Sequence, residues 1–486
     1  MNQTCKSIGT VLLGIAVFAF WLGLYPQALN YQEQNQLFLF TWAYLGERLA
    51  LPGGGADYVS EFLVQFFYWP WAGALILAVL AVLTQLATWK AAKCLGGGNA
   101  SLYPISFIPS LLTLVYMGDM EVLVSYPVAL LGALALCPVF CKAGWHRLWL
   151  IPIGWWLIGP LVALPVLLSA LGNHRWADLL VAGYLLVVLF AGYRLLADQY
   201  PWKDAFFGIN YYRLVESLPL LQVIIPAVAV LCILVCGRNL ASRQAAALDA
   251  ALSAVLVLGT AAGVKLSYDK DAYEVLAYDS LIRHERYGQV VRRAMKYQPR
   301  DQVSACSVNF CLFAGGELNK RLGEFYQCGT EGLVLPSIRD NVSDITSAEL
   351  LWMMGMPNVT LQYYFDLQES IQNGRKSGRF TARIADCNIV NGWYDRAERY
   401  LDILSHSLCY RKWAEEKRAL IRDESRVAAD PEYAYVRSVR FRDDFIMDYG
   451  ALDLMMALLY NQNRNNFMAA EYYVAWQKLK KLEETE

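Results

Sequence analysis

The chain has 486 residues, of which 56% are hydrophobic and 17% charged, and its mean hydropathy is +0.29. These values are too apolar for a single water-soluble domain and predict a membrane protein. The formal net charge is −1, so the sequence has neither the basic surface of a nucleic-acid-binding protein nor a polyanionic tail. DNA and RNA are therefore not expected partners.

Charged residues are distributed unevenly along the chain. Residues 1–265 hold 24 of the 85 Lys, Arg, Asp and Glu side chains, and residues 266–486 hold the other 61. The sequence therefore predicts two domains. Residues 1–265 are expected to form a membrane-embedded bundle, and residues 266–486 a water-exposed domain that is long enough to bury its own core.

Eight stretches of the first domain approach the length of about 20 apolar residues that a membrane span needs. They are 8–26, 69–89, 103–118, 121–141, 147–171, 177–197, 218–237 and 246–265. No small-residue cleavage motif follows the first stretch, which is therefore expected to remain as an anchor. The third is short and has Pro104 and Pro109 near its start, so a re-entrant hairpin is an alternative there.

The loops of this eight-span arrangement carry eight Lys or Arg on the side of the N-terminus and four on the other side. Because basic loops stay in the cytoplasm, both termini and the C-terminal domain are expected there, with the lipid bilayer as a partner. The 11 cysteines form no CxxC pair and no even disulfide pattern. No metal and no other cofactor is expected.

The first loop, residues 27–68, is more than a simple connection. Its apolar residues recur at helical spacing, the run from Pro52 to Gly55 ends one helix, and a second amphipathic helix is expected over 58–67. A long acidic loop after the first span resembles the GT-C glycosyltransferases, which use polyprenyl-phosphate-linked sugars. In that family an acidic residue of this loop acts as a base or metal ligand, and the resemblance points to Glu33 or Asp57. The loop has no Asp-Asp, Asp-x-Asp or Asp-Glu pair, and a solvated or helix-capping carboxylate is the alternative.

From Asp269 onward the apolar residues lie three and four apart, which predicts successive helices. A local pattern recurs at intervals of 71, 36 and 73 residues, close to multiples of 36. Its copy NGWYDRAERYLDIL resembles the second helix of a tetratricopeptide repeat. The resemblance implies that Gly392 lies in the turn before this helix. It also implies that six residues pack successive helical hairpins, namely Tyr287, Gly392, Tyr394, Ala397, Tyr400 and Ala470. An irregular helical domain is the alternative.

The segment NGRKSGRFTAR contains four basic residues, Arg375, Lys376, Arg379 and Arg383. On the groove of a helical-repeat domain they could hold the acidic end of a peptide. The alternative is a solvated loop followed by a helix start. His284 and His406 have no Ser or Cys at a recognisable motif spacing, so no catalytic triad is predicted.

The PGG-containing loop and the tail segments SGRFTARIADCNIVNGWYDRAERYLDIL and NNFMAAEYYVAWQKL resemble an uncharacterised group of bacterial multi-pass membrane proteins with tetratricopeptide-like C-terminal helices. The apolar windows and helical spacing predict an all-α fold, with a transmembrane bundle of about eight spans and a helical-repeat domain, and the resemblance implies a bacterial inner membrane. The expected function is a membrane-anchored interaction scaffold that binds a protein or peptide, and an enzyme is not favoured. The alternative is a GT-C-like lipid-linked-sugar glycosyltransferase or a related envelope-polymer enzyme.

Overall fold

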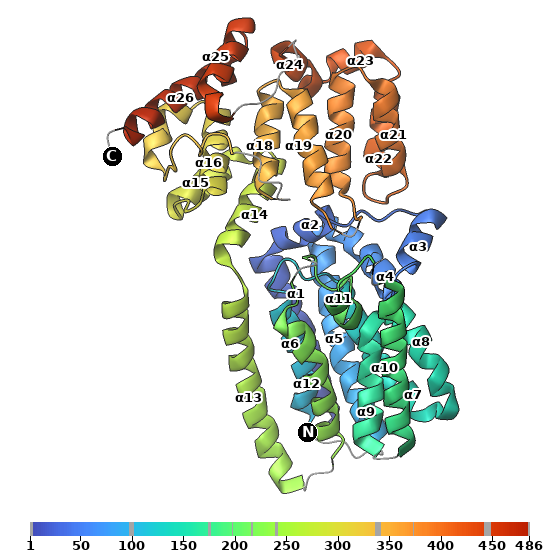
Figure 1. The fold of residues 1–486 in the computed structure, drawn as a ribbon. Helices are drawn as coiled ribbons and strands as arrows, with labels where there is room; N and C mark the ends of the chain where they lie inside the picture. Colours follow the sequence, from blue (N-terminus) through green and yellow to red (C-terminus); the bar gives the residue numbers. More distant parts are fainter. Residues whose placement is uncertain are drawn as a thin grey trace. The chain divides into compact units, whose positions relative to one another are not determined.

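The computed structural model describes residues 3–96, 102–173, 176–196, 198–214, 217–238, 242–335, 342–372, 374–441 and 449–484. Within these ranges the regular secondary structure is helical, and β-type pairing is limited to two isolated bridges. The helices form two compact units (Figure 1). The N-terminal bundle comprises Met1–Glu33 and Phe40–Asp269, and the C-terminal domain comprises Lys270–Glu486 together with Gln34–Leu39. Local sequence patterns do not indicate that residues 34–39 belong to the second unit.

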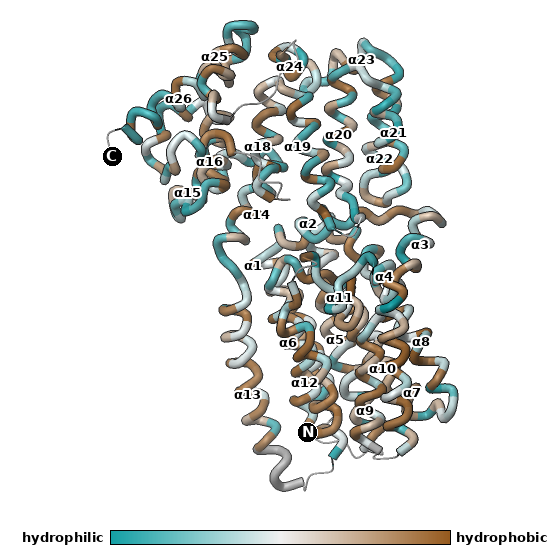
Figure 2. Tube along the Cα trace, in the orientation of Figure 1, coloured by the Kyte–Doolittle hydropathy of each residue, from teal (hydrophilic) through white to brown (hydrophobic). Residues whose placement is uncertain are grey.

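The long helices of the N-terminal bundle are rich in apolar residues, as the brown tube of Figure 2 shows for α5, α7 and α12. They are α1 (Gln3–Leu24), α5 (Pro70–Leu95), α6 (Ile108–Tyr116), α7 (Ser125–Lys142), α8 (Arg147–Ile158), α9 (Ala163–Asn173), α10 (Trp176–Leu196), α12 (Leu220–Cys236) and α13 (Ser242–Ser267). Shorter elements are α2 (Pro26–Gln34), α3 (Trp42–Leu49), α4 (Gly54–Val64), η1 (Gln65–Tyr68), η2 (Tyr103–Phe107), η3 (Gly144–His146), η4 (Gly159–Val162) and α11 (Trp202–Phe207).

Among the residues of this bundle that the structure describes, six stretches are long and apolar enough to cross a membrane. They are Thr4–Leu24, Pro70–Leu95, Ser125–Lys142, Gly144–Gly172, Trp176–Leu196 and Leu248–Ser267. The expected windows 103–118 and 218–237 coincide with shorter apolar helices, Tyr103–Tyr116 and Leu220–Cys236. Large apolar side chains of α10 and α13 face outward, with Leu180 76% and Leu258 71% exposed, as lipid-facing residues would be.

The expected span 147–171 is not one continuous helix. α8 ends at Ile158, and Gly159 adopts a φ of +66°, which glycine tolerates better than other residues. Nη1 of Arg147, at the start of α8, lies 3.3 Å from Oγ of Ser169, in α9. A straight helix would place residues 22 positions apart about 33 Å from each other. The chain therefore turns back at Gly159, and α8 and α9 form a hairpin.

The connections between the long helices lie at two opposite ends of the bundle. At the Lys6 end, the ammonium group of Lys6 lies over the rings of Trp89 and Tyr103, 4.7 and 5.5 Å from their centroids. At the Tyr268 end, the ring of Tyr268 stacks on that of Tyr25 with centroids 5.1 Å apart. α1 separates Lys6 from Tyr25 by about 28 Å. The start of α1 and the end of α13 are thus at opposite ends of the bundle.

The C-terminal domain is a succession of short helices in which sequence neighbours pack against one another. They are α14 (Lys270–Arg283), α15 (Tyr287–Lys296), α16 (Gln302–Ala314), α17 (Leu318–Arg321), η5 (Leu322–Glu324), α18 (Ser343–Met353), α19 (Pro357–Glu369), α20 (Gly378–Val390), α21 (Tyr394–Ser405), α22 (Arg411–Leu420), α23 (Glu424–Ala429), α24 (Pro431–Val439), η6 (Tyr449–Ala451), α25 (Leu452–Gln462) and α26 (Phe467–Glu483). The largest part of its core joins α14 to α20 with α25 and α26, and includes the fully buried Tyr364 and Tyr472.

Candidate functional site

The first loop carries a buried ionic cluster built on α3 and α4. The carboxylate of Glu61 is fully buried, pairs with Nε of Arg48 at 2.9 Å, and accepts a hydrogen bond from the hydroxyl of Tyr44. The guanidinium of Arg48 also lies over the ring of Tyr44, 4.8 Å from its centroid. Burial and the negative charge of Glu61 raise the pKa of Tyr44, which therefore stays protonated and donates its hydrogen bond.

The PGG motif of this loop is required by close backbone packing. Gly53 has a φ of +80°, and its N–H donates to the carbonyl of Trp156 near the end of α8 at 2.9 Å. A Cβ on Gly54 would lie 1.9 Å from the carbonyl oxygen of Arg48. The turn therefore brings α4 back against α3 and places Asp57 and Glu61 inside the bundle.

A second polar cluster lies at the Tyr268 end of the bundle. Arg213 pairs with Glu121 at 2.9 Å, and the Tyr31 hydroxyl donates to the same carboxylate at 3.0 Å. The side-chain amide of Gln32 donates to the carbonyls of Met120 and Val122 at 2.8 and 2.9 Å. The loop after α6 is thereby fixed to α2.

The two carboxylates suggested by the glycosyltransferase resemblance are both shielded from solvent. Glu33 is 3% and Asp57 1% exposed, so neither is the solvated side chain that the sequence offered as an alternative. Glu61, which the sequence did not single out, is the acidic residue of the loop with the clearest ion pair. Across the described ranges, no group of three or more His, Cys, Asp or Glu side chains could hold a metal ion.

The segment that joins α2 to α3 belongs to the C-terminal domain, and the surface that it covers there is hereafter called the groove. Residues 34–39, hereafter the docked segment, begin with the last residue of α2 and continue outside regular secondary structure, and the N–H of Leu37 donates to the carbonyl of Lys376 at 2.7 Å. The side chain of Leu37 is 5% exposed and packs in an apolar cluster. The other buried members of that cluster come from α20 to α22 and the turn before α22: Ala385, Leu401, Leu404, Tyr410 and Ala414.

Arg379 fixes the other end of the docked segment. Its Nη1 donates to the side-chain carbonyl of Gln34 at 2.8 Å, and the same guanidinium forms two bonds to Asp279, at 2.7 and 2.9 Å. Two of the basic positions proposed for peptide recognition, Lys376 and Arg379, therefore contact a peptide segment of the chain itself. Lys376 does so through its backbone, and its side chain is exposed.

The remaining basic candidates lie within the domain. Arg375 is buried, at 4% exposure. Arg383 pairs with Glu349 at 2.7 Å and with Glu432 at 2.6 Å. Burial alone would raise the pKa of Glu349, but Arg383 and Arg379 lower it below its ordinary value. Binding of an acidic peptide by Arg383 would therefore require breaking these internal pairs.

Asp386 differs from Glu349, another carboxylate of this ionic network, because its pKa is raised. Burial raises its pKa to about 6, although Arg383 and Lys417 act in the opposite direction. The hydroxyl of Tyr433 donates a hydrogen bond to this carboxylate, and Lys417 lies over the Tyr433 ring, 4.1 Å from its centroid. The network thus contains a group that titrates near neutral pH.

The predicted hairpin residues occupy varied positions. Ala397 is fully buried, and Tyr287 and Tyr400 are half-buried with ring contacts to Phe310 and Phe365. Gly392 has a φ of +75° just after α20, in the turn where the sequence placed it. In α26, Ala469 is fully buried and Ala470 only half-buried, so the small residue in the core lies one position before the predicted one.

Gly392 and Tyr394 border a polar cleft of about 720 Å³. Arg437 forms one wall: its Nε donates to the carbonyl of Val390 at 3.1 Å, and its Nη1 pairs with Glu424 at 2.6 Å. The hydroxyl of Tyr394 also donates to Glu424. Burial raises the pKa of Tyr394, and so does its hydrogen bond to Glu424. The cleft wall is thus internally paired.

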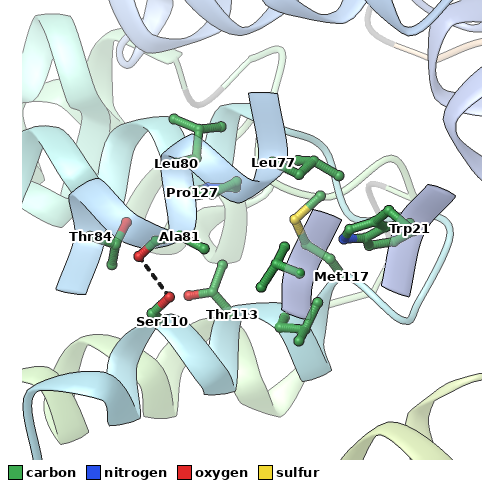
Figure 3. Close-up of a pocket in the computed structure, with 11 residues that line it drawn as sticks. Trp21, Leu77, Leu80, Ala81, Thr84, Ser110, Thr113, Met117 and Pro127 are labelled. Carbon is green, nitrogen blue, oxygen red and sulfur yellow. Dashed lines mark hydrogen bonds between the residues drawn. The ribbon is translucent and has the colours of Figure 1, made fainter. Parts of the chain in front are cut away.

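The N-terminal bundle contains a small, mainly apolar cavity between α1, α5, α6 and α7 (Figure 3). Trp21, Leu77 and Met117 line it, and the Ser110 hydroxyl donates to the carbonyl of Ala81 at 2.8 Å. Its volume is about 20 Å³, which suits one water molecule and no larger ligand. The hydroxyl groups beside it stabilise the contact between α5 and α6.

Comparison with known proteins identifies a family but no characterised relative. A model of a family of unknown function (DUF6057) matches residues 2–481. No curated protein and no solved structure matches the chain.

Proposed function

Because the chain belongs to this family of unknown function, whose model covers almost its whole length, we propose a function from the geometry alone: the protein is a membrane-anchored interaction protein whose C-terminal domain binds extended polypeptide segments. The observation that carries the proposal is the docked segment. Its backbone pairs with Lys376, its Gln34 amide with Arg379, and its Leu37 side chain packs in an apolar cluster. Backbone pairing combined with side-chain pockets is a general mode of peptide recognition.

We propose further that α18 to α21 form tetratricopeptide-like hairpins. Consecutive helices pack as neighbours in this region, and Ala397 lets α21 approach its partners closely. The turn at Gly392 closes with a hydrogen bond from the Trp393 N–H to the Asn388 carbonyl at 2.8 Å, which satisfies the end of α20. Helical-repeat domains have no chemistry of their own and usually present a binding surface.

For the bundle we propose nine membrane crossings in a bacterial inner membrane, with α8 and α9 counted separately. An odd number agrees with the opposite positions of Lys6 and Tyr268. Among described residues, helix ends and loops at the Lys6 end carry seven basic residues: Lys6, Lys90, Lys93, Lys142, Arg147, Arg238 and Arg243. The Tyr268 end carries five: Arg48, Arg194, Lys203, Arg213 and Lys265. The more basic end favours the cytoplasm, so residues after 269 would emerge at the opposite, outer side of the membrane. This proposal replaces the cytoplasmic position of the C-terminal domain that was expected for eight spans.

Site-specific photocrosslinking of the full-length protein in its native membrane tests the proposed function. A photoreactive residue at Lys376, an exposed position at the groove, is expected to give a discrete adduct that excess peptide with the sequence of residues 33–40 suppresses. The same residue at Lys412, whose side chain is 90% exposed on α22, is the control and should give no such adduct. Equal adducts at both positions, or none at Lys376, would contradict the proposal.

One observation favours a second candidate, a GT-C-like glycosyltransferase. The first loop buries Asp57 and Glu61 beside Arg48, and Glu33 lies in α2 close in sequence to Tyr31, the partner of Glu121. Buried ionisable groups in a membrane bundle are functional candidates. Such an enzyme needs a carboxylate as base or metal ligand, and its replacement by the amide typically costs at least about 10²-fold in rate. An interaction protein tolerates that replacement.

A further inference from the structure

We propose that the docked segment is an intramolecular competitor. It fills the groove in which a partner protein would bind through an extended segment that has a Gln or Asn three residues before a Leu. The inference rests on the proposed function, because it assumes that this groove binds a partner. It adds the chemistry of the partner segment and a condition for binding, namely that residues 34–39 leave the groove first.

The contacts of the docked segment define what the groove recognises. The carbonyl of Lys376 accepts one main-chain N–H at 2.7 Å, so the ligand must leave a backbone N–H free at that position. The guanidinium of Arg379 donates to the side-chain carbonyl of Gln34 at 2.8 Å, and an Asn or Gln supplies the same acceptor. The apolar cluster around Leu401 and Leu404 accepts the Leu37 side chain. A partner segment with these three features would make the same contacts.

The walls of the groove have hydrogen bonds of their own besides those to the docked segment. Arg379 keeps its two bonds to Asp279 when Gln34 leaves, so no unpaired charge remains. The start of α20 is capped by Ser377, whose hydroxyl accepts from the N–H of Phe380 at 3.2 Å. α20, α21 and α22 also pack in sequence against one another. The groove can therefore persist when it is empty.

The docked segment is tethered at both ends, because Glu33 and Phe40 belong to the N-terminal bundle. A short tether gives a bound segment an effective concentration on the order of millimolar. A free peptide must compete with the tethered segment. Its apparent affinity is therefore its intrinsic affinity multiplied by the fraction of molecules whose groove is empty. For a groove that binds the free peptide at about 10 μM, the reduction is roughly 100-fold.

Fluorescence anisotropy of a labelled peptide with the sequence of residues 33–40, titrated with the full-length protein in detergent, tests the inference. Wild-type protein should bind it weakly, and the variant Gln34→Ala/Leu37→Ala should bind it at least tenfold more tightly. Phe40→Ala, which changes a 47% exposed residue just outside the docked segment, is the matched control and should behave as wild type. Arg379→Gln in the double variant should weaken binding again.

Hydrogen exchange of α20 to α22 checks that the double variant keeps its fold. A folded double variant that binds the peptide no better than wild type would overturn the inference. A second measurement leaves the docked segment intact: a spin label at Phe40→Cys, with Cys5 and Cys94 replaced by Ser, should become more mobile when unlabelled peptide is added in excess. An unchanged spectrum at millimolar peptide would also overturn it. If a partner is crosslinked at Lys376 but the anisotropy or the spin-label result is negative, the proposed function stands. Only the inference that the docked segment competes with the partner is then wrong.

Discussion

The backbone N–H of Leu37 donates to the carbonyl of Lys376 at 2.7 Å, which joins the first loop to the start of α20. Two sequence features that seemed unrelated, a long loop after the first apolar helix and a basic segment in the C-terminal half, therefore meet in one groove. The C-terminal domain is completed by a segment from the other end of the chain. This arrangement is the basis for proposing that the domain binds extended polypeptides.

Gly54→Ala should destabilise the bundle strongly, because its Cβ would lie 1.9 Å from the carbonyl oxygen of Arg48, a backbone atom that cannot rotate away. Overpacking of this kind costs about 1–3 kcal/mol or more. Gly46→Ala is the matched control, since no atom lies within 4 Å of its Cβ and alanine favours the helix. Thermal unfolding of the two purified full-length variants measures the difference, and equal melting temperatures would contradict the packing of this turn.

Reporter fusions after Lys93 and after Asp269 should report opposite sides of the membrane. Lys93 lies in the last turn of α5, at the Lys6 end, and Asp269 follows the tyrosine that defines the other end. The fusion after Lys93 is expected in the cytoplasm and the fusion after Asp269 outside. If both fusions report the same side, the hairpin of α8 and α9 does not add a crossing, and the proposed topology is wrong.

Asp386 should make the C-terminal domain more stable as the pH falls from 7 to 5. Its pKa is about 6 in the folded protein and 3.8 as the ordinary value, so the folded state binds the proton more tightly. The stability from this group is fully present below pH 3.8 and is lost as the pH rises from there through about 6, at up to about 1.4 kcal/mol per pH unit. Asp386→Asn should remove this dependence. Hydrogen exchange of α20 in both full-length proteins at pH 5, 6 and 7 measures it, and parallel pH profiles would contradict the assignment.

Ala397→Leu should destabilise the C-terminal domain, because Ala397 is fully buried between helices and a larger side chain overpacks the contact at a cost of about 1–3 kcal/mol. Ala470→Leu should cost less, since Ala470 is half-buried. Urea unfolding of the two full-length variants, followed by the exchange of α21 and α26, compares them. A larger loss for Ala470→Leu would mean that the helix faces are assigned incorrectly.

Local sequence signals predicted the elements that depend on local physics. Apolar windows located the helices of the bundle, and Gly392 was expected in a turn, where its φ is +75°. The reversal within 147–171 had a signal, because the adjacent Gly159 and Pro160 interrupt the apolar window. Hydropathy averages over such a pair, and a single span was therefore predicted.

The candidate site was less accessible to sequence reasoning. Gln34 is a polar residue of the first loop, yet its side chain is buried and bonded to Arg379, 345 positions away. A solvated carboxylate was one alternative for the acidic residues of the first loop, but Glu61 is buried and paired with Arg48. Neither partner can be identified from local periodicity. Whether Ala469 or Ala470 lies in the core also depends on how α26 packs against its neighbours.

Complementation of a deletion strain of the native host tests the central claim most directly, with the deletion phenotype, the envelope glycan profile and the protein level measured together. The interaction account predicts that Glu33→Gln and Asp57→Asn complement fully at normal protein level, whereas Arg379→Gln, at a matched level, does not. Loss of complementation by Glu33→Gln or Asp57→Asn with a normal protein level, accompanied by the glycan defect of the deletion strain, would contradict the account and establish the enzyme in its place.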